Sequence, residues 1–300
     1  MQTKTYLFAL MAMAFTLGSC SDNENGIGSE TSKYITVSTS IGNMTRVATD
    51  ANGGQTFEEG DEISVYAWTG APTVAPETSE RVVNNAINKL TNGSWVSTPQ
   101  MLWKNNRDKH YFIGVYPTAA ISDLSAGEYT FDVNKQTESD LLVAVNPDGL
   151  SYSADAQQTV PLTFTHVMAK LAVNLTYKNQ WGGIPTVEKV VVGNAAKEAT
   201  INYLTKVVTP STTAKEDFSL PEITENTKYV SVIIPQEEVK QLTIVIGGKN
   251  FVYDNGTPFK LESGKITTVN LEVGRDEIKL GDVKITDWED GSTFSGEAIN

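Results

Sequence analysis

The amino-acid sequence predicts an all-β protein with two domains. Short runs rich in Val, Ile, Thr, Tyr and Phe alternate with polar residues and are separated by Gly, Asn, Asp and Pro, which is typical of a β-sandwich or barrel. No long amphipathic helix is convincing, because the best candidate, residues 77–90, lacks helical periodicity. At about 100 to 200 residues per domain, a chain of 300 residues suggests two domains.

The N-terminus has the pattern of an export signal. Lys4 precedes an apolar run, residues 6–15, that is too short to span a bilayer as a mature helix. Cys20, the only cysteine in the chain, follows small residues at the expected cut, and this arrangement resembles the lipobox of bacterial lipoproteins. The resemblance implies that signal peptidase II removes residues 1–19 and that acyl chains on Cys20 anchor the protein to a membrane leaflet. An ordinary signal with a cut near a cysteine is the alternative.

The first strand is expected directly after a polar tether. Residues 21–30 are polar and acidic, as in a tether, and no second cysteine is present to form a disulfide. Residues 34–41 alternate in polarity, which places one set of side chains on a single face: Ile35, Val37, Thr39 and Ile41. Arg46 follows in a polar, small-residue segment of the kind that proteases cut. A cut between Arg46 and Val47 would release this strand and leave an unpaired edge that recruits another strand.

Further strands and tight turns follow along the chain. The alternating runs predict strands at residues 62–68, 111–116, 128–133, 167–177, 229–234, 242–246 and 266–273. Asn-Gly pairs, which tolerate positive φ, predict hairpin turns at residues 91–94 and 254–257.

A weak internal sequence repeat supports two similar domains. Residues 109–117 align with residues 227–235 with Tyr and Pro in register, and residues 124–129 parallel residues 261–266 in the same order. Convergent turn chemistry is the alternative explanation. We place the domain boundary after residue 163, so that the two domains are residues 47–163 and 164–300.

The C-terminus offers a candidate donor strand. Residues 283–288 alternate, and a turn leads into a polar and apolar tail that reaches residue 300. The apolar side chains of this candidate are Val283, Ile285, Trp288, Phe294 and Ile299. Burying three or four of them would contribute about 5 to 10 kcal/mol before the entropy of ordering. Pairing of both end strands within their own chain is the alternative.

Charge and composition point away from nucleic acid and from catalysis. The 23 basic and 36 acidic residues give a net charge of −13, without the basic face that phosphate binding needs. His110 and His166 belong to no zinc or nucleophile motif, and we expect His166 to be a structural, hydrogen-bonded histidine. Glu58, Glu59 and Asp61 fit a solvated acidic turn better than a glycosidase pair. We therefore expect no enzymatic activity, no metal and no cofactor.

Four tryptophans allow two interpretations. They either line a sugar-binding face or belong to the cores of the domains, and we favour the cores. The residues are Trp68, Trp95, Trp103 and Trp181.

Motifs spread over nearly the whole chain resemble those of the fimbrillin-like lipoproteins. They are the signal that ends in Cys20 and residues 45–47, 57–66, 115–117, 136–144, 162–171 and 285–288. The resemblance implies two transthyretin-like β-sandwich domains, lipoprotein export, cleavage by an Arg-specific protease and strand exchange between subunits of a type V pilus. On this pattern residues 20–46 are the removed tether and first strand, Arg46 and Val47 flank the cut, and residues 283–300 hold the donor strand.

The resulting hypothesis is a stalk or tip subunit of a type V pilus that mediates cell adhesion. Its partners would be other pilin subunits and a receptor on a host or bacterial surface, and it would reach the surface through the outer membrane. The alternative is an uncut outer-membrane lipoprotein that serves as a pilus anchor or glycan-binding adhesin. A β-sandwich hydrolase is a third possibility.

Overall fold

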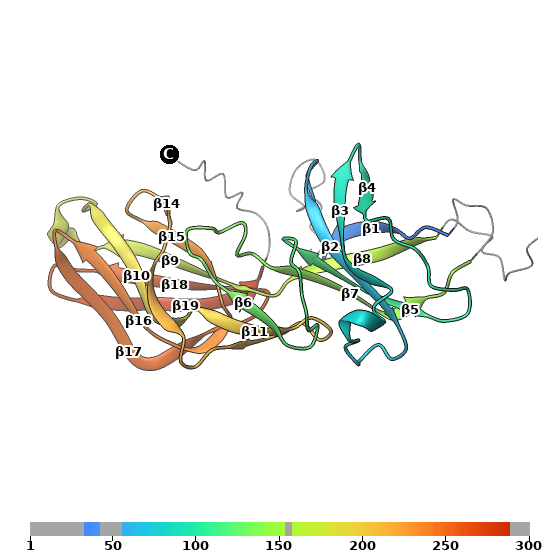
Figure 1. Cartoon of the computed structure of the whole chain (residues 1–300). Coiled ribbons are helices and arrows are strands. Elements are labelled where there is room, and N and C mark those ends of the chain that lie inside the picture. The colour runs from blue at the N-terminus through green and yellow to red at the C-terminus, as the bar shows by residue number, and fades with distance from the viewer. Residues whose placement is uncertain (1–32, 43–55, 154–157, 289–300) are drawn as a thin grey trace, which may run out of the picture.

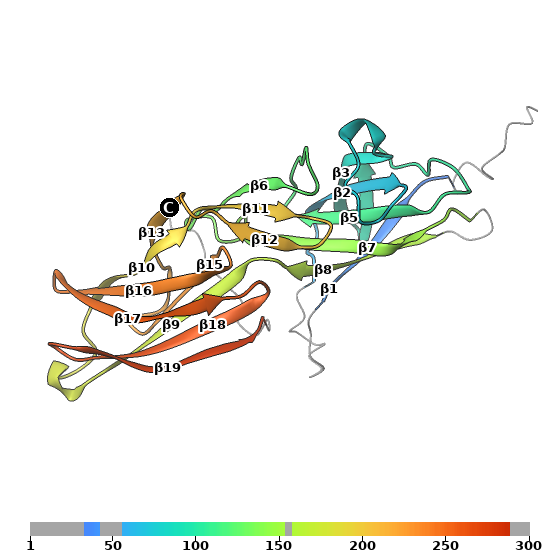
Figure 2. The ribbon, with the colours of Figure 1, turned by 90° about the horizontal axis from the view of Figure 1, so that it is seen from below.

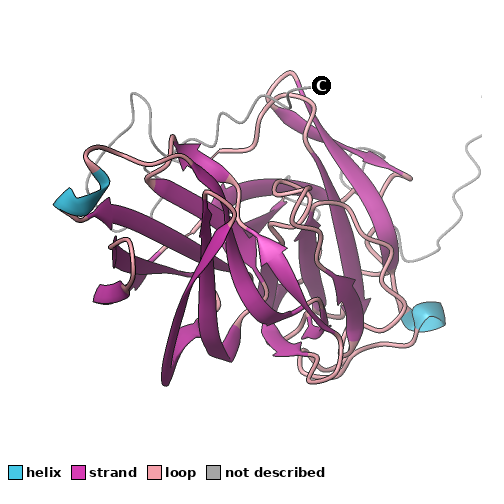
Figure 3. Cartoon of the chain, turned by 90° about the vertical axis from the view of Figure 1, so that its left-hand side faces the viewer, coloured by secondary structure: helices cyan, strands magenta, loops and turns pink. Residues whose placement is uncertain are grey.

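The structure is a computed structural model that describes residues 33–42, 56–153 and 158–288 (Figure 1). Strands dominate these residues, as Figure 3 shows, and helical structure in them is limited to two short 3₁₀ helices, η1 (Thr78–Glu80) and η2 (Asn179–Trp181). No helix among them is long and apolar enough to cross a membrane. The all-β prediction is confirmed.

One seven-stranded sheet forms the first half of the molecule. In spatial order its strands are β1 (Thr36–Ile41), β8 (Thr159–His166), β7 (Leu142–Leu150), β5 (His110–Tyr116), β2 (Glu62–Thr69), β3 (Val83–Thr91) and β4 (Ser94–Thr98). Neighbouring strands are antiparallel, except that β1 runs parallel to β8.

The two ends of this sheet meet, so that it curls around a core of its own. Nε1 of Trp95 in β4 donates a hydrogen bond to Oγ1 of Thr39 in β1 at 3.0 Å. Just before β1, Tyr34 forms an isolated bridge with Leu102. The enclosed core contains side chains from every strand of the sheet except β4, whose Trp95 packs against it. Strand β1 therefore closes the first core.

Two facing sheets form the second half. One contains β14 (Glu222–Thr224), β15 (Lys228–Ile233), β9 (Ala169–Tyr177), β18 (Lys265–Val273) and β19 (Ile278–Asp287), and the other contains β13 (Lys215–Ser219), β10 (Val187–Ala196), β16 (Gln236–Ile246) and β17 (Lys249–Leu261). Buried residues such as Leu171 and Val269 from the first sheet share one core with Val190 and Ile244 from the second.

The two halves are joined by more than a linker. Strand β8 ends at His166 and β9 begins at Ala169, so the chain passes directly from one half into the other (Figure 1). Strand β6 (Gly127–Thr130) pairs with β11 (Glu198–Asn202), which also pairs with β12 (Val207–Pro210), and Figure 2 shows this small sheet beside both halves. The expected boundary after residue 163 falls inside β8, because the alternating burial of that strand continues to its last residue.

The sequence located the strands better than the turns. Every predicted strand overlaps an observed one, with ends displaced by a few residues. The turn at residues 91–94 is confirmed, with φ of 51° at Asn92 and 73° at Gly93. The turn at residues 254–257 is wrong, because these residues lie within β17 where the pairing with β16 shifts register. Gly247 and Gly248, with φ of 59° and 71°, form that hairpin turn instead, since glycine adopts positive φ at both central positions without strain.

Candidate functional site

The first strand inserts its apolar face into the first core. Ile35 and Val37 are only 2% and 6% exposed, and Ile41 is partly buried against the same core. The outward hydroxyls form a ladder with β8, in which the Oγ atoms of Thr36 and Thr159 are 3.2 Å apart. The predicted alternation of this strand is therefore seen, and its residues fill a slot in the first core.

Strand β8 forms one wall of this slot and depends on β1 for its pairing. Register pairs run from Thr36 opposite Thr159 to Ile41 opposite Phe164. On its other side, β7 pairs only with residues 164–166 of β8. Among the described strands, residues 159–163 therefore have β1 as their only partner. Removing β1 would leave an open edge as well as exposed apolar side chains.

The opposite wall comes from residues 101–103. The backbone N–H of Ile35 donates to the carbonyl of Met101 at 2.9 Å, and that of Trp103 donates to the carbonyl of Lys33 at 3.2 Å. Met101 and Trp103 are 2% and 4% exposed and belong to the same core as Ile35. Sequence reasoning missed this wall. All three residues, Met101, Leu102 and Trp103, are apolar, so the sequence does not show the alternating burial that the structure has.

Aromatic rings close the slot where β1 ends. The ring of Phe57 lies edge-on to Trp95, Tyr116 and Phe164, at centroid distances of 5.3, 5.3 and 5.1 Å. Burial raises the pKa of Tyr116 to about 12, with a smaller contribution from the negative charge of Asp61. The Tyr116 hydroxyl therefore stays neutral and points its proton at the Asp61 carboxylate, 3.4 Å away.

The two histidines have structural surroundings. His110 is fully buried and stacks edge-on against Trp103, and its Nε2 accepts the backbone N–H of Lys104 at 3.1 Å. Burial lowers the pKa of His110, so its ring is neutral near pH 7. Nδ1 of His166 lies 2.8 Å from a carboxylate oxygen of Asp140, in agreement with the predicted hydrogen-bonded histidine.

The last described strand lies at the edge of its sheet. Strand β19 pairs only with β18 among the described strands. Val283 and Ile285 lie opposite the buried residues Val269 and Thr267, yet they are 36% and 41% exposed. The facing sheet therefore leaves the apolar side of β19 partly uncovered.

Trp288 anchors the end of β19. It is 2% exposed, and its indole stacks on the His166 ring at a centroid distance of 4.1 Å. Nζ of Lys170 lies 4.2 Å from the indole centroid, and the backbone N–H of Trp288 donates to the carbonyl of Gly264 at 3.1 Å. This contact between residues far apart in the sequence was not predicted, because stacking across the fold has no local signal.

A family comparison covers most of the chain. The fimbrillin-like family model matches residues 45–288. The chain belongs to the fimbrillin-like family. No curated protein matches its sequence significantly.

Solved structures share the fold of this fimbrillin-like chain. A candidate cell adhesion protein from Bacteroides uniformis has a TM-score of 0.60 at 20% identity, covering 78% of this chain and 93% of that chain. A candidate cell adhesion protein from Bacteroides ovatus has a TM-score of 0.62 at 17% identity, covering 85% and 98%. A fimbrial protein from Bacteroides vulgatus has a TM-score of 0.50 at 14% identity, covering 84% and 99%.

The tryptophans of this fimbrillin-like chain do not gather on one exposed face. Trp68 and Trp103 are buried in different cores, at 2% and 4% exposure. Trp95 packs against the first core, whereas Trp181 packs in the second half and donates from Nε1 to the carbonyl of Val273 at 2.9 Å. The structure therefore supports the core interpretation over the sugar-binding face.

The remaining predicted site residues lie outside the described part of the chain. They are Cys20, Arg46, Val47, Phe294 and Ile299. Within the described part, no group of three or more His, Cys, Asp or Glu side chains is placed to hold a metal ion.

Proposed function

We propose that this fimbrillin-like chain is a structural subunit of a type V pilus and assembles by exchanging its first strand. The observation that supports the proposal is the position of β1, which closes the first core and, among the described strands, alone pairs with residues 159–163. A cut between Arg46 and Val47 would separate this strand from the rest of the chain. The vacated slot would then bind a strand from a second copy through main-chain hydrogen bonds and alternate apolar side chains.

The segment after Trp288 is the part that we propose to be donated. Trp288 holds β19 in its own chain, so the donor begins beyond it. Residues 289–300 number 12 and span about 40 Å when extended. Residues 33–41, which β1 and its flank fill, span about 30 Å. The tail is therefore long enough to replace the first strand.

The tail also has a side suited to the slot. In an extended strand Phe294, Gly296 and Ala298 share one side, whereas Glu297 and Ile299 lie on the other. Burying an unpaired carboxylate is costly, so the Phe294 side would face the core. Phe294 is then the main apolar anchor of the donor.

Export and location form part of the same proposal. We propose that signal peptidase II cuts before Cys20, that lipid on Cys20 holds the precursor in the outer membrane, and that the mature subunit acts at the cell surface in adhesion. The fimbrial and cell adhesion descriptions of the similar structures support this location. The role is structural rather than enzymatic.

Replacing Arg46 with alanine tests the proposal. We expect Arg46→Ala to keep a folded, monomeric chain with β1 attached and to abolish pilus polymers on the cell. Arg275→Ala removes an exposed arginine on the hairpin between β18 and β19, and this variant should assemble normally. Normal polymer from Arg46→Ala would refute processing at this position.

The closed form of the chain favours a second candidate, an uncut surface lipoprotein. With β1 paired to β8, the chain's own Ile35 and Val37 fill the first core. Such a protein would act as a pilus anchor or a glycan-binding adhesin. N-terminal sequencing of protein from the cell surface separates the two candidates, because a subunit begins at Val47 and an anchor begins at an acylated Cys20.

A further inference from the structure

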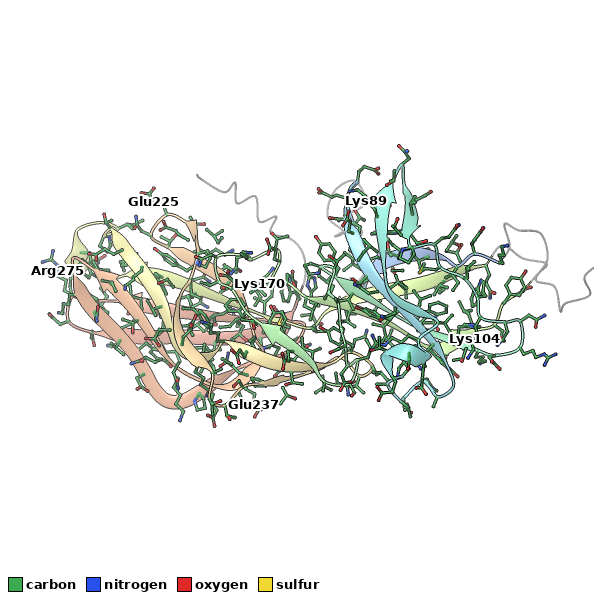
Figure 4. The ribbon with its side chains drawn as sticks, viewed as in Figure 1. Lys89, Lys104, Lys170, Glu225, Glu237 and Arg275 are labelled. Carbon is green, nitrogen blue, oxygen red and sulfur yellow. The ribbon has the colours of Figure 1, made fainter. Side chains whose placement is uncertain are left out.

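The slot of the first strand has a basic end. At the start of β1, the Lys33 carbonyl pairs with Trp103, and the loop of residues 104–109 follows directly. This basic loop carries three exposed cations, Lys104, Arg107 and Lys109, and one exposed acid, Asp108, so it is basic on balance. None of the three lies within ion-pair distance of a carboxylate in the described part of the chain. Figure 4 shows Lys104 on the first half, away from the junction marked by Lys170.

The other end of the slot is acidic. Ile41 lies opposite Phe164, whose ring contacts Phe57. The three acids that follow Phe57 closely are Glu58, Glu59 and Asp61, and none has a cationic partner among the described residues. In a chain with a net charge of −13, the two ends of one slot therefore differ in sign.

The sequence that flanks the resident strand matches this polarity. Residues 21–35, which precede β1, contain three acids and a single cation, Lys33. Residues 43–49, which follow it, contain Arg46 and no acid. Opposite charges at each end favour the observed direction of β1, parallel to β8.

The C-terminal tail begins with acids, as the sequence before β1 does, but it has no counterpart of Arg46. Glu289 and Asp290 stand at its start, Glu297 is the only later acid, and residues 289–300 contain no Lys or Arg. A tail that entered antiparallel to β8 would bring Glu289 and Asp290 to the acidic end of the slot. A tail that entered parallel would bring them to the basic loop.

We infer that the slot selects the direction of the incoming strand, so that the tail of a second copy lies parallel to β8, like the strand that it replaces. Glu289 and Asp290 then face the basic loop. In the matching register Phe294 takes the place of Ile35 beside Met101 and Trp103, and Glu297 takes the solvent-facing place of Ser38. The inference rests on the proposed strand exchange and adds its direction and its electrostatic determinant.

Disulfide capture tests the direction. The full chain carries Cys20→Ser and one new cysteine, either Asn106→Cys in the basic loop or Glu58→Cys at the acidic end, and is cut after Arg46 by an Arg-specific protease. The probe is a synthetic peptide of residues 289–300 with a cysteine added before Glu289. We expect capture mainly at Asn106→Cys, and a peptide with its cysteine after Asn300 should reverse the preference. Capture mainly at Glu58→Cys by the first peptide would overturn the inference.

Charge reversal in the basic loop tests whether its positive charge determines the direction of the strand. The double variant Lys104→Glu, Lys109→Glu should take up the peptide about tenfold more slowly at low salt, and high salt should remove most of the difference. The matched variant Lys189→Glu, Lys240→Glu changes two exposed lysines of the second half and should take it up at the normal rate. Equal uptake rates for both variants would overturn the inference. Heparin binding by the uncut chain reports the positive charge of the basic loop. The inference would also fall if the double variant lost heparin binding but took up the peptide at the normal rate.

The outcomes separate this inference from the proposed function. If the cut chain polymerises but captures the peptide in the reverse direction, strand exchange stands and the inferred direction falls. If the cut chain neither polymerises nor takes up peptide, the proposed function fails and the inference fails with it.

Discussion

The imidazole of His110 is fully buried beside Trp103, and burial lowers its pKa. In the unfolded chain the ring binds a proton near its ordinary pKa of 6.5, whereas the folded chain resists protonation until a lower pH. The unfolded state therefore binds more protons in this window, and stability rises with pH. The contribution of His110 is complete above pH 6.5 and is lost as the pH falls toward the folded pKa.

His110→Gln should remove this dependence. Below pH 6.5, the free energy of unfolding should fall with decreasing pH in the native chain more steeply than in the variant. We expect the two slopes to differ by up to about 1.4 kcal/mol per pH unit. Urea denaturation of both proteins between pH 5 and pH 7.5 measures the two slopes. Equal slopes would show that His110 is protonated as easily in the folded chain as in the unfolded one.

At the residue scale, the sequence predicted what local periodicity records. Ile35 and Val37 were identified as one face because strand side chains alternate, and both are buried. Met101 and Trp103 flank the apolar but exposed Leu102, so no alternation in the sequence marks them as one face. The stacking of Trp288 on His166 joins positions 122 residues apart in the sequence, so no local pattern indicates it.

At the element scale, β19 is an edge strand that pairs with β18 along its length and is followed directly by the buried Trp288. Trp288 is buried in the core of the second half, whereas Val283 is partly exposed. Trp288→Ala should lower the free energy of unfolding by about 3 to 5 kcal/mol, as for other buried tryptophans. Val283→Ala is the matched control and should cost about 0.5 kcal/mol. Chemical denaturation measures both, and similar losses would argue that Trp288 is not the anchor.

The turns show where element prediction succeeds and fails. Asn92 and Gly93 form a hairpin turn because both adopt positive φ between Thr91 and Ser94, which pair directly across the hairpin. The same dipeptide at residues 255–256 lies within β17, because Gly247 and Gly248 already satisfy the requirement of that hairpin. A local preference for positive φ is therefore necessary for a tight turn but does not choose between two candidate sites in one hairpin.

At the scale of the whole molecule, the halves are bound together by β6. Tyr66 and Trp68 of the first half belong to the same core as the second half. Gly127 of β6 lies so close to Tyr203 that a Cβ atom would stand 2.5 Å from the ring. The pairing of β6 with β11 crosses the domain boundary that the internal repeat suggested. Arguments from chain length and from the repeat could not predict this pairing, because they treat each half alone.

Calorimetry tests this coupling. We expect the native chain to unfold in a single transition, since one core spans both halves. Gly127→Val should displace β6 and add an earlier transition at a lower temperature. Glu128→Val places the same side chain on the exposed side of β6 and should leave one transition. Two separate transitions in the native chain would show that the halves unfold independently.

The direct passage from β8 into β9 has a mechanical consequence. A strand seated in the slot would hold β8 by a parallel ladder, and β9 is held by β18 in another parallel ladder. Tension applied to a chain of such subunits would enter at β8, cross residues 167–168 and leave through β18 and β19. Both ladders would be loaded along the strands, so their hydrogen bonds would share the force rather than break one after another. A fibre built in this way would resist flow by shear, with the covalent backbone as the link between its two sheets.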